Sequence, residues 1–121
     1  MLIKKSGYKL TQVIRQKKVI VYADENGNEP YNSWIDGLKD KKSQQRIRTR
    51  VRRLGEGLYG DCESVGKGIS ELRMFFGSGY RVYFGEDADN IVVLLCGGDK
   101  DSQDRDIKSA KEYWKDYRDN G

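Results

Sequence analysis

The sequence contains no histidine. This absence excludes histidine-based catalytic triads, histidine metal ligands and acid–base catalysis by an imidazole group. The cysteines, Cys62 and Cys96, lie far apart and belong to no paired metal-ligand spacing, so we expect neither a structural zinc site nor any cofactor. Cys96 ends an apolar run, and we expect it to be a buried, reduced thiol.

Long apolar runs are also lacking. The longest, residues 91–96, is far too short to cross a bilayer, and no signal peptide is visible. A chain of 121 residues suits one domain with a single modest core. We therefore expect a cytoplasmic protein without membrane contact, in which a basic and weakly patterned extension (residues 1–17), open to being flexible, precedes one domain (residues 18–121).

Charge is plentiful but unevenly distributed. Charged residues make up 35% of the chain, and the formal net charge is +4. Residues 39–53 form a basic block in which Asp40 is the single acidic residue, whereas acidic residues outnumber basic ones over residues 86–106. The basic block suggests a polyanionic partner, because charge patterning of this kind promotes association.

Hydrophobic periodicity predicts the secondary structure. Strands are expected over residues 18–23, 71–76, 80–85 and 91–96, and the last is apolar throughout, as is typical of a central strand buried on both faces. Helices are expected from Pro30 to about residue 38, over 41–55 and over 103–117, whereas the glycine-rich residues 57–68 favour a loop. This order predicts an α+β fold, with an N-terminal helical hairpin packed on a mostly antiparallel sheet of about four strands and a C-terminal helix.

Residues 71–85, ELRMFFGSGYRVYFG, predict a β-hairpin, because Gly77-Ser78-Gly79 supplies the positive φ angles of a tight turn. If position 76 faces 80, then 74 faces 82, 73 faces 83 and 72 faces 84. One face then collects apolar side chains for a core. The other interleaves guanidinium groups with aromatic rings, which suits phosphates and unstacked bases: Arg73, Phe75, Arg81 and Tyr83. The alternative is a solvated face on which the arginines cover the rings.

RNA cleavage does not require histidine. The adjacent 2′-hydroxyl can act as the nucleophile, so the protein need only orient the strand, neutralise the phosphate and move protons. Arg73 and Arg81 suit the phosphate, because a guanidinium group matches its oxygens and can stabilise the added charge of the transition state. The general acid and base stay open among several groups whose pKa values would have to be shifted: Lys67, Glu71, Tyr83, Lys100 and a carboxylate near Asp104.

Five segments occur in a fixed order with compatible spacing: WIDGLKD (34–40), RVRRLGEGLYGD (50–61), VGKGISELR (65–73), GSGYRVYFG (77–85) and LLCGGDKDSQDRDI (94–107). Through them, residues 19–114 resemble the HigB-like branch of the RelE/ParE superfamily, the phage-derived addiction-module killer proteins of type II toxin–antitoxin systems. The resemblance implies a small sheet packed against an N-terminal helical hairpin. It also implies an RNA-cleaving toxin that acts on mRNA in the ribosomal A site and is silenced by a cognate antitoxin.

The resemblance further implies site residues. Arg81, in a Gly-Tyr-Arg match to the family's hairpin, corresponds to a phosphate contact, Arg73 lies where related toxins carry basic active-site residues, and Lys100 matches an often basic position. Related enzymes commonly place a tyrosine or histidine just beyond, where this chain has DSQDRDI, so Gln103, Asp104 and Asp106 are either site residues or groups that favour the helix N-terminus. The candidate catalytic residues are thus Arg73, Arg81 and Lys100. The candidate RNA-binding residues are Lys67, Phe75, Tyr83, Arg46, Arg50, Arg53 and Gln103.

Three functions stay open. The first is a metal-independent endoribonuclease toxin whose partners are mRNA, the ribosome and an antitoxin, expected to be of helix-turn-helix type. The second is a non-enzymatic inhibitor of DNA gyrase like the ParE branch, and the third is an RNA-binding module without cleavage. The basic, aromatic face of the hairpin favours the first, because an inhibitor that binds a protein has no need for convergent phosphate-binding groups.

Overall fold

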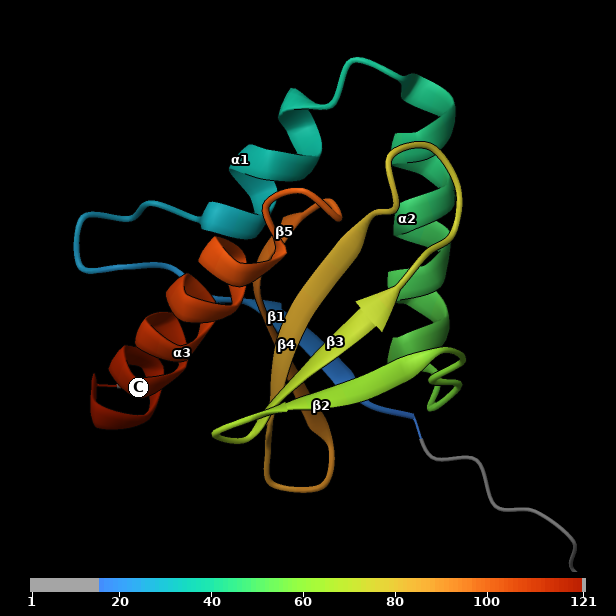
Figure 1. The fold of residues 1–121 in the computed structure, drawn as a ribbon. Coiled ribbons are helices and arrows are strands. Elements are labelled where there is room, and N and C mark those ends of the chain that lie inside the picture. Colours follow the sequence, from blue (N-terminus) through green and yellow to red (C-terminus); the bar gives the residue numbers. More distant parts are fainter. Residues whose placement is uncertain (1–15, 121) are drawn as a thin grey trace, which may run out of the picture.

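The computed structural model describes residues 16–120 (Figure 1). In chain order the elements are β1 (Lys18–Val21), α1 (Pro30–Gly37), α2 (Lys41–Gly55), β2 (Cys62–Gly66), β3 (Ile69–Arg73), β4 (Arg81–Asp87), β5 (Ile91–Gly98) and α3 (Gln103–Asn120). None of these helices is both long enough and apolar enough to span a membrane.

All strands join one sheet in the order β1-β5-β4-β3-β2. Strand β1 runs parallel to β5, and every other neighbouring pair is antiparallel. The predicted α+β class is confirmed. Strand β5 lies inside the sheet between β1 and β4, and its residues from Val92 to Cys96 are buried, as its apolar sequence predicted.

Two hydrophobic clusters lie on opposite faces of the sheet. One joins α1 and α2 to the even-numbered positions of the central strands, including Leu72, Val82 and Phe84. The other joins α3, through Ala110 and Trp114, to residues that include Tyr83 and Leu95. Figure 1 shows α2 and α3 on either side of the sheet. The helical pair therefore covers one face, and the C-terminal helix covers part of the face that the sequence left open.

Helix α2 has the predicted bounds, because its ends and its apolar seam are both encoded locally. Asp40 caps the N-terminus by accepting hydrogen bonds from the Lys42 amide at 3.1 Å and the Ser43 hydroxyl at 2.8 Å. Ile47 and Leu54 are fully buried on one side, and most of the arginines lie on the others. Helix α3 begins at Gln103 as predicted and continues to Asn120, beyond the predicted end at residue 117.

Strand β2 was predicted to be part of a glycine-rich loop. It is an edge strand, and Glu63 and Ser64 expose their side chains, so the apolar alternation that marks a half-buried strand is missing. The pairing with β3 is also irregular between Ser64 and Gly66. The strand is nevertheless fixed by its neighbour, and it brings Glu63 directly opposite Glu71.

The hairpin of β3 and β4 has the predicted faces but a different register. Arg73 pairs with Arg81 and Leu72 with Val82, whereas the predicted partners of these two residues lay two positions further along β4, at 83 and 84. The strands separate earlier than expected, because β3 ends at Arg73 and a loop with positive φ angles at Gly77 (56°) and Gly79 (76°) connects it to β4. The shift is even, so the side chains within β3 and β4 keep their faces, but the arginines now lie directly opposite each other.

The predicted N-terminal extension lies almost wholly outside the described residues. Of residues 1–17, the structure describes Gln16 and Lys17. The Lys17 amide donates to the Gly55 carbonyl at 2.7 Å, and its ammonium group contacts a Glu86 carboxylate oxygen at 3.2 Å. The end of the extension is therefore tied to α2 and to β4.

Candidate functional site

The arginine pair, Arg73 and Arg81, forms the centre of the candidate site. Arg73 is the last residue of β3 and Arg81 is the first of β4, so the two face each other where the hairpin opens into its loop. Their side chains are 30% and 13% exposed. Both charges therefore reach the surface, but Arg81 is largely enclosed.

A buried glutamate supports the pair. Glu71 is 0% exposed, and its carboxylate accepts hydrogen bonds from Arg73 Nε at 2.8 Å, the Tyr83 hydroxyl at 2.9 Å and Gln103 Nε2 at 2.9 Å. Arg81 Nε lies 3.5 Å from the same carboxylate, and this buried nitrogen makes no hydrogen bond to a described residue. Glu71 thus joins β3, β4 and α3 at one point, and it holds both guanidinium groups in place.

The pKa values of these groups follow from their surroundings. Burial alone would raise the pKa of Glu71, but the hydrogen bonds from Arg73, Gln103 and Tyr83 outweigh it and hold the pKa below its ordinary value. Burial, together with the hydrogen bond to Glu71, raises the pKa of Tyr83 well above its ordinary value. Glu71 is therefore an ionised carboxylate and Tyr83 a neutral phenol near neutral pH, so neither group is poised to exchange a proton there.

The prediction that Tyr83 contacts RNA is wrong. Its side chain is 0% exposed and lies in the cluster beneath α3, so it presents no ring to a base. The sequence placed Tyr83 on the correct face of the hairpin, but strand periodicity does not reveal which helix covers that face. Its structural role is to donate a hydrogen bond to Glu71.

An exposed carboxylate adds a residue that the sequence analysis did not single out. Glu63 on β2 lies 2.7 Å from Arg73 Nη1, and its side chain is 58% exposed. The sequence did not predict this contact because it did not predict β2, and the pairing of β2 with β3 is what brings Glu63 next to Glu71. A solvent-exposed ion pair of this kind contributes little to stability and exchanges readily for another anion.

Lys100 lies beside the same end of the hairpin. Its amide contacts the Ser78 carbonyl at 3.4 Å, and both Lys100 Cβ and Arg81 Nη1 lie close to Gly79. Gln103, at the start of α3, hydrogen-bonds Glu71 and so acts here as a positioning residue. The backbone of Lys100 therefore lies beside the loop that joins Arg73 to Arg81.

The predicted acidic alternatives belong to the start of α3. Asp106 accepts a hydrogen bond from the Ser102 hydroxyl at 2.5 Å, and Asp99 accepts one from the Ser102 amide at 3.2 Å. These contacts organise the turn before the helix, whereas Asp104 is exposed. Within residues 16–120, no cluster of three or more His, Cys, Asp or Glu side chains could hold a metal ion.

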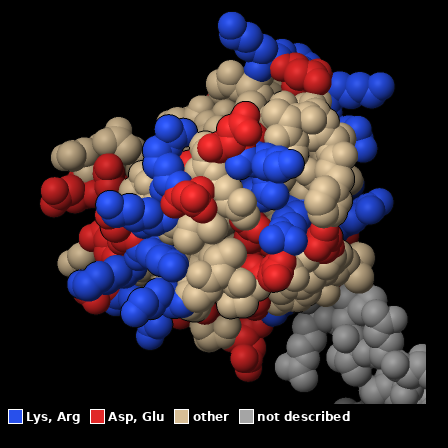
Figure 2. All heavy atoms as spheres, in the orientation of Figure 1, with Lys and Arg blue, Asp and Glu red and all other residues tan. Residues whose placement is uncertain are grey.

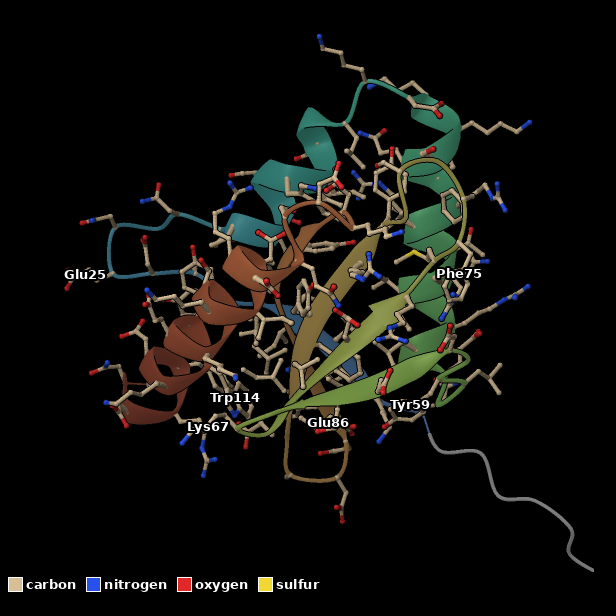
Figure 3. The ribbon with its side chains drawn as sticks, in the orientation of Figure 1. Glu25, Tyr59, Lys67, Phe75, Glu86 and Trp114 are labelled. Carbon is tan, nitrogen blue, oxygen red and sulfur yellow. The ribbon has the colours of Figure 1, made fainter. Side chains whose placement is uncertain are left out.

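A groove lies between α2 and the loop after β3. Its volume is about 400 Å³, and its lining includes Arg46, Arg50 and Arg53 from the helix and Met74, Phe75 and Phe76 from the loop. Phe75 is 79% exposed, the most exposed large apolar side chain among the described residues (Figure 3). The predicted RNA-binding residues Arg46, Arg53 and Phe75 thus meet in one place.

Arg50 holds this region together instead of offering a free guanidinium group. Its Nη1 donates to the Arg73 carbonyl at 2.8 Å, and its Nη2 contacts the carbonyls of Tyr59 at 3.4 Å and Asp61 at 3.3 Å. Arg50 thus supports the backbone at the groove wall, and RNA binding by Arg50 stays a prediction. The contact does tie the wall of the groove to the strand that carries the arginine pair.

Lys67 lies away from both features. It occupies the turn between β2 and β3, at the end of β3 remote from Arg73, which places it at least roughly 13 Å along the strand. There it borders a separate cavity of about 590 Å³ with Lys111, Trp114, Lys115 and Arg118, where Figure 2 shows a group of basic side chains. The structure does not join Lys67 to the candidate site.

Comparison with known proteins gives one clear relative. No protein-family model matches the chain. An uncharacterized protein of Haemophilus influenzae is 48% identical over 81 residues, which cover 67% of this chain and 82% of the relative. The chain belongs to the same family as that protein. The relationship establishes common ancestry.

The site offers positive charge in two settings. At the arginine pair, the charges are fixed by Glu71 and partly balanced by Glu63, so an anion placed there would meet preorganised donors. In the groove, arginines stand beside an open aromatic ring. Together these features suit a flexible polyanion that carries both phosphates and planar bases.

Proposed function

We propose that this protein is the toxin of a type II toxin–antitoxin module, a HigB-like member of the RelE/ParE superfamily that cleaves mRNA on the ribosome. The observation that carries the proposal is the direct pairing of Arg73 with Arg81 beside Lys100. The segments that carry the family resemblance supply these residues and their support, since VGKGISELR contains Glu71 and Arg73 and GSGYRVYFG contains Arg81 and Tyr83.

In the proposed reaction the scissile phosphate binds between the two guanidinium groups. Glu63 leaves Arg73 Nη1 as the phosphate arrives, while Glu71 keeps hold of Arg73 Nε and fixes its orientation. The neighbouring 2′-oxygen then attacks phosphorus as its proton passes to solvent water, and the bond to the 5′-oxygen breaks as that oxygen takes a proton from solvent. The products are a 2′,3′-cyclic phosphate and a free 5′-hydroxyl. The arginines stabilise the negative charge that accumulates between these events.

Glu71 and Tyr83 are poor candidates for proton transfer, because the pKa of each is shifted away from neutrality and both side chains are buried. Lys100 is the exposed ionisable side chain beside the turn. The main catalytic contribution proposed for the protein is therefore orientation of the strand and stabilisation of charge.

The proposal places the protein in the cytoplasm with mRNA, the ribosome and a cognate antitoxin as partners. A basic site that acts on cellular RNA has to be masked when it is not needed. An acidic or helical segment of an antitoxin of helix-turn-helix type would complement the arginines.

The test is a translation extract programmed with a defined mRNA. We expect wild-type protein to cut the message and stop translation, and Arg81→Ala to reduce cleavage by at least 100-fold, the loss typical when a transition-state donor is removed. Arg52→Ala is the control, because Arg52 is exposed on α2 and outside the groove lining. Full cleavage by folded Arg81→Ala protein would refute the assignment of the site.

One observation favours a second candidate, a ParE-like inhibitor of DNA gyrase. The most buried ionisable groups of the site, Glu71 and Tyr83, serve structure and are not tuned for proton transfer. Intact mRNA in the extract together with blocked supercoiling by purified gyrase would establish this candidate in place of the first. RNA binding without cleavage, even with ribosomes present, would instead indicate a plain RNA-binding module.

A further inference from the structure

The loop after β3 presents an aromatic side chain that the fold does not use. Phe75 is 79% exposed, although its neighbours Met74 and Phe76 both pack against the core cluster of α1 and α2. Strand periodicity would put Phe75 on the face of Arg73, but β3 ends at Arg73 and the loop turns Phe75 into the groove beside α2 instead. Burial and folding therefore give no reason for a phenyl ring at this position.

The charge around Phe75 is of one sign. The groove is lined by Arg46, Thr49, Arg50, Arg53, Met74, Phe75 and Phe76, and no carboxylate contributes to this lining within the described part of the chain. Arg46 places its guanidinium carbon 3.9 Å from the centroid of the Phe76 ring, so one wall already stacks a cation on an aromatic face. A ligand for this groove should be anionic and should contain a flat apolar surface.

The groove lies next to the strand that carries Arg73. Arg50 Nη1 binds the carbonyl of Arg73, and Phe75 follows Arg73 by two positions in the sequence. Figures 1 and 3 show the loop that carries Phe75 alongside α2. Two residues span at most about 7 Å of chain, so Phe75 lies within about one nucleotide length of the backbone of Arg73.

We propose that Phe75 is a stacking platform for an unpaired base of the nucleotide that neighbours the phosphate held at Arg73 and Arg81, with Arg46 and Arg53 contacting that strand's backbone. The inference rests on the proposed function, which it deepens by requiring a locally single-stranded substrate. A base inside a duplex is already stacked on its neighbours, and its flat surface is not available to the ring. Any of the four bases can stack on the ring, so Phe75 should favour single-stranded RNA over duplex RNA and should accept any base sequence.

Binding can be tested separately from cleavage. The probe is a fluorescently labelled ten-nucleotide RNA in which every ribose is 2′-O-methylated, so that no 2′-hydroxyl nucleophile exists, and fluorescence anisotropy measures its affinity. We expect Phe75→Ala to bind it roughly 5- to 100-fold more weakly than wild type, the range reported by alanine substitution of stacking residues. Phe75→Trp should restore or exceed wild-type affinity, because the indole ring also stacks.

Two matched controls isolate the effect. Leu58→Ala removes the other exposed large apolar side chain, which is 42% exposed and outside the groove lining, and it should leave affinity unchanged. Arg53→Gln should weaken binding and flatten its salt dependence, whereas Arg52→Gln, one position along the same helix, should do so much less. A duplex of the same strand should bind wild type and Phe75→Ala equally.

The outcomes are distinct. The platform is overturned if Phe75→Ala binds the RNA as tightly as wild type, or if Phe75→Trp does not restore the affinity. It is also overturned if Phe75→Ala loses only antitoxin binding, because the groove would then be a protein-docking surface. A protein that cuts no mRNA but shows the Phe75 dependence on the methylated strand would refute the proposed cleavage and leave the platform standing. Thermal unfolding of each variant confirms that the measurements compare folded proteins.

Discussion

The arginine pair and the groove show two ways of presenting positive charge. At the pair, Arg73 and Arg81 are held by the buried carboxylate of Glu71, and Arg73 is further balanced by Glu63. In the groove, Arg46 and Arg53 are exposed and form no ion pair with a carboxylate among residues 16–120. At the pair, the carboxylates fix the orientation of the guanidinium groups but neutralise part of their charge. In the groove, the arginines keep their full charge, but no carboxylate fixes their orientation. Under the proposed function, the first arrangement suits the phosphate where the bond breaks and the second suits the flanking strand.

The largest effect is expected when the carboxylate that holds the arginine pair is removed. Glu71→Gln should lower the free energy of unfolding by about 3 kcal/mol, because it leaves Arg73 and Arg81 without their buried counter-charge. Urea unfolding followed by circular dichroism measures the change, and Glu25→Gln, at an exposed position with no ion pair among the described residues, is the control. An unchanged urea midpoint would mean that Glu71 does not hold the pair together.

The pH dependence of stability should reveal the same carboxylate. The folded-state pKa of Glu71 is depressed below the ordinary 4.5, so its stabilising contribution is present above about pH 4.5 and is lost as the pH falls through the folded-state value. Asp24 and Asp40 also have lowered pKa values, through hydrogen bonds from Asn28 and Ser43 respectively, and they contribute to acid sensitivity in every variant. The urea midpoint of wild type should therefore fall more steeply below pH 4.5 than that of Glu71→Gln. Parallel curves for the two proteins would contradict this assignment.

The smallest effect is expected at the outer carboxylate. Glu63→Gln removes the exposed partner of Arg73 and should leave the urea midpoint nearly unchanged. Affinity for the methylated RNA should rise about two- to fivefold, because one fewer anion competes with the phosphate. Glu56→Gln, an exposed change at the end of α2, provides the comparison by anisotropy. Weaker binding by Glu63→Gln would show that Glu63 orients Arg73 and does not merely compete for it.

The sequence predicted what strand and helix periodicity can encode. The bounds of α2, the central position of β5 and the assignment of Leu72 and Arg73 to opposite faces were all confirmed. Each depends on residues close together in the chain, through a helix cap, an apolar run or the alternation of a strand.

What the sequence did not predict depends on which elements meet. Strand β2 has a polar, exposed sequence and forms through its pairing with β3, so the contact of Glu63 with Arg73 was not predicted. Tyr83 was placed on the correct face but lies under α3, and Phe75 left that face because the loop begins earlier than its glycines suggested. Tertiary contacts decided all three positions, and no local pattern reports them.

The carboxylate of Glu71 receives hydrogen bonds from the strand that carries it, the adjacent strand and the start of α3. A substitution of Glu71 should therefore reduce the stability of the fold and disturb the arginine pair at the same time. Under the proposed function, variants that lose toxicity but keep the fold, and so still bind an antitoxin, must carry their substitutions elsewhere. The ring of Phe75 is such a position, because it is exposed and makes no contact with the Glu71 junction.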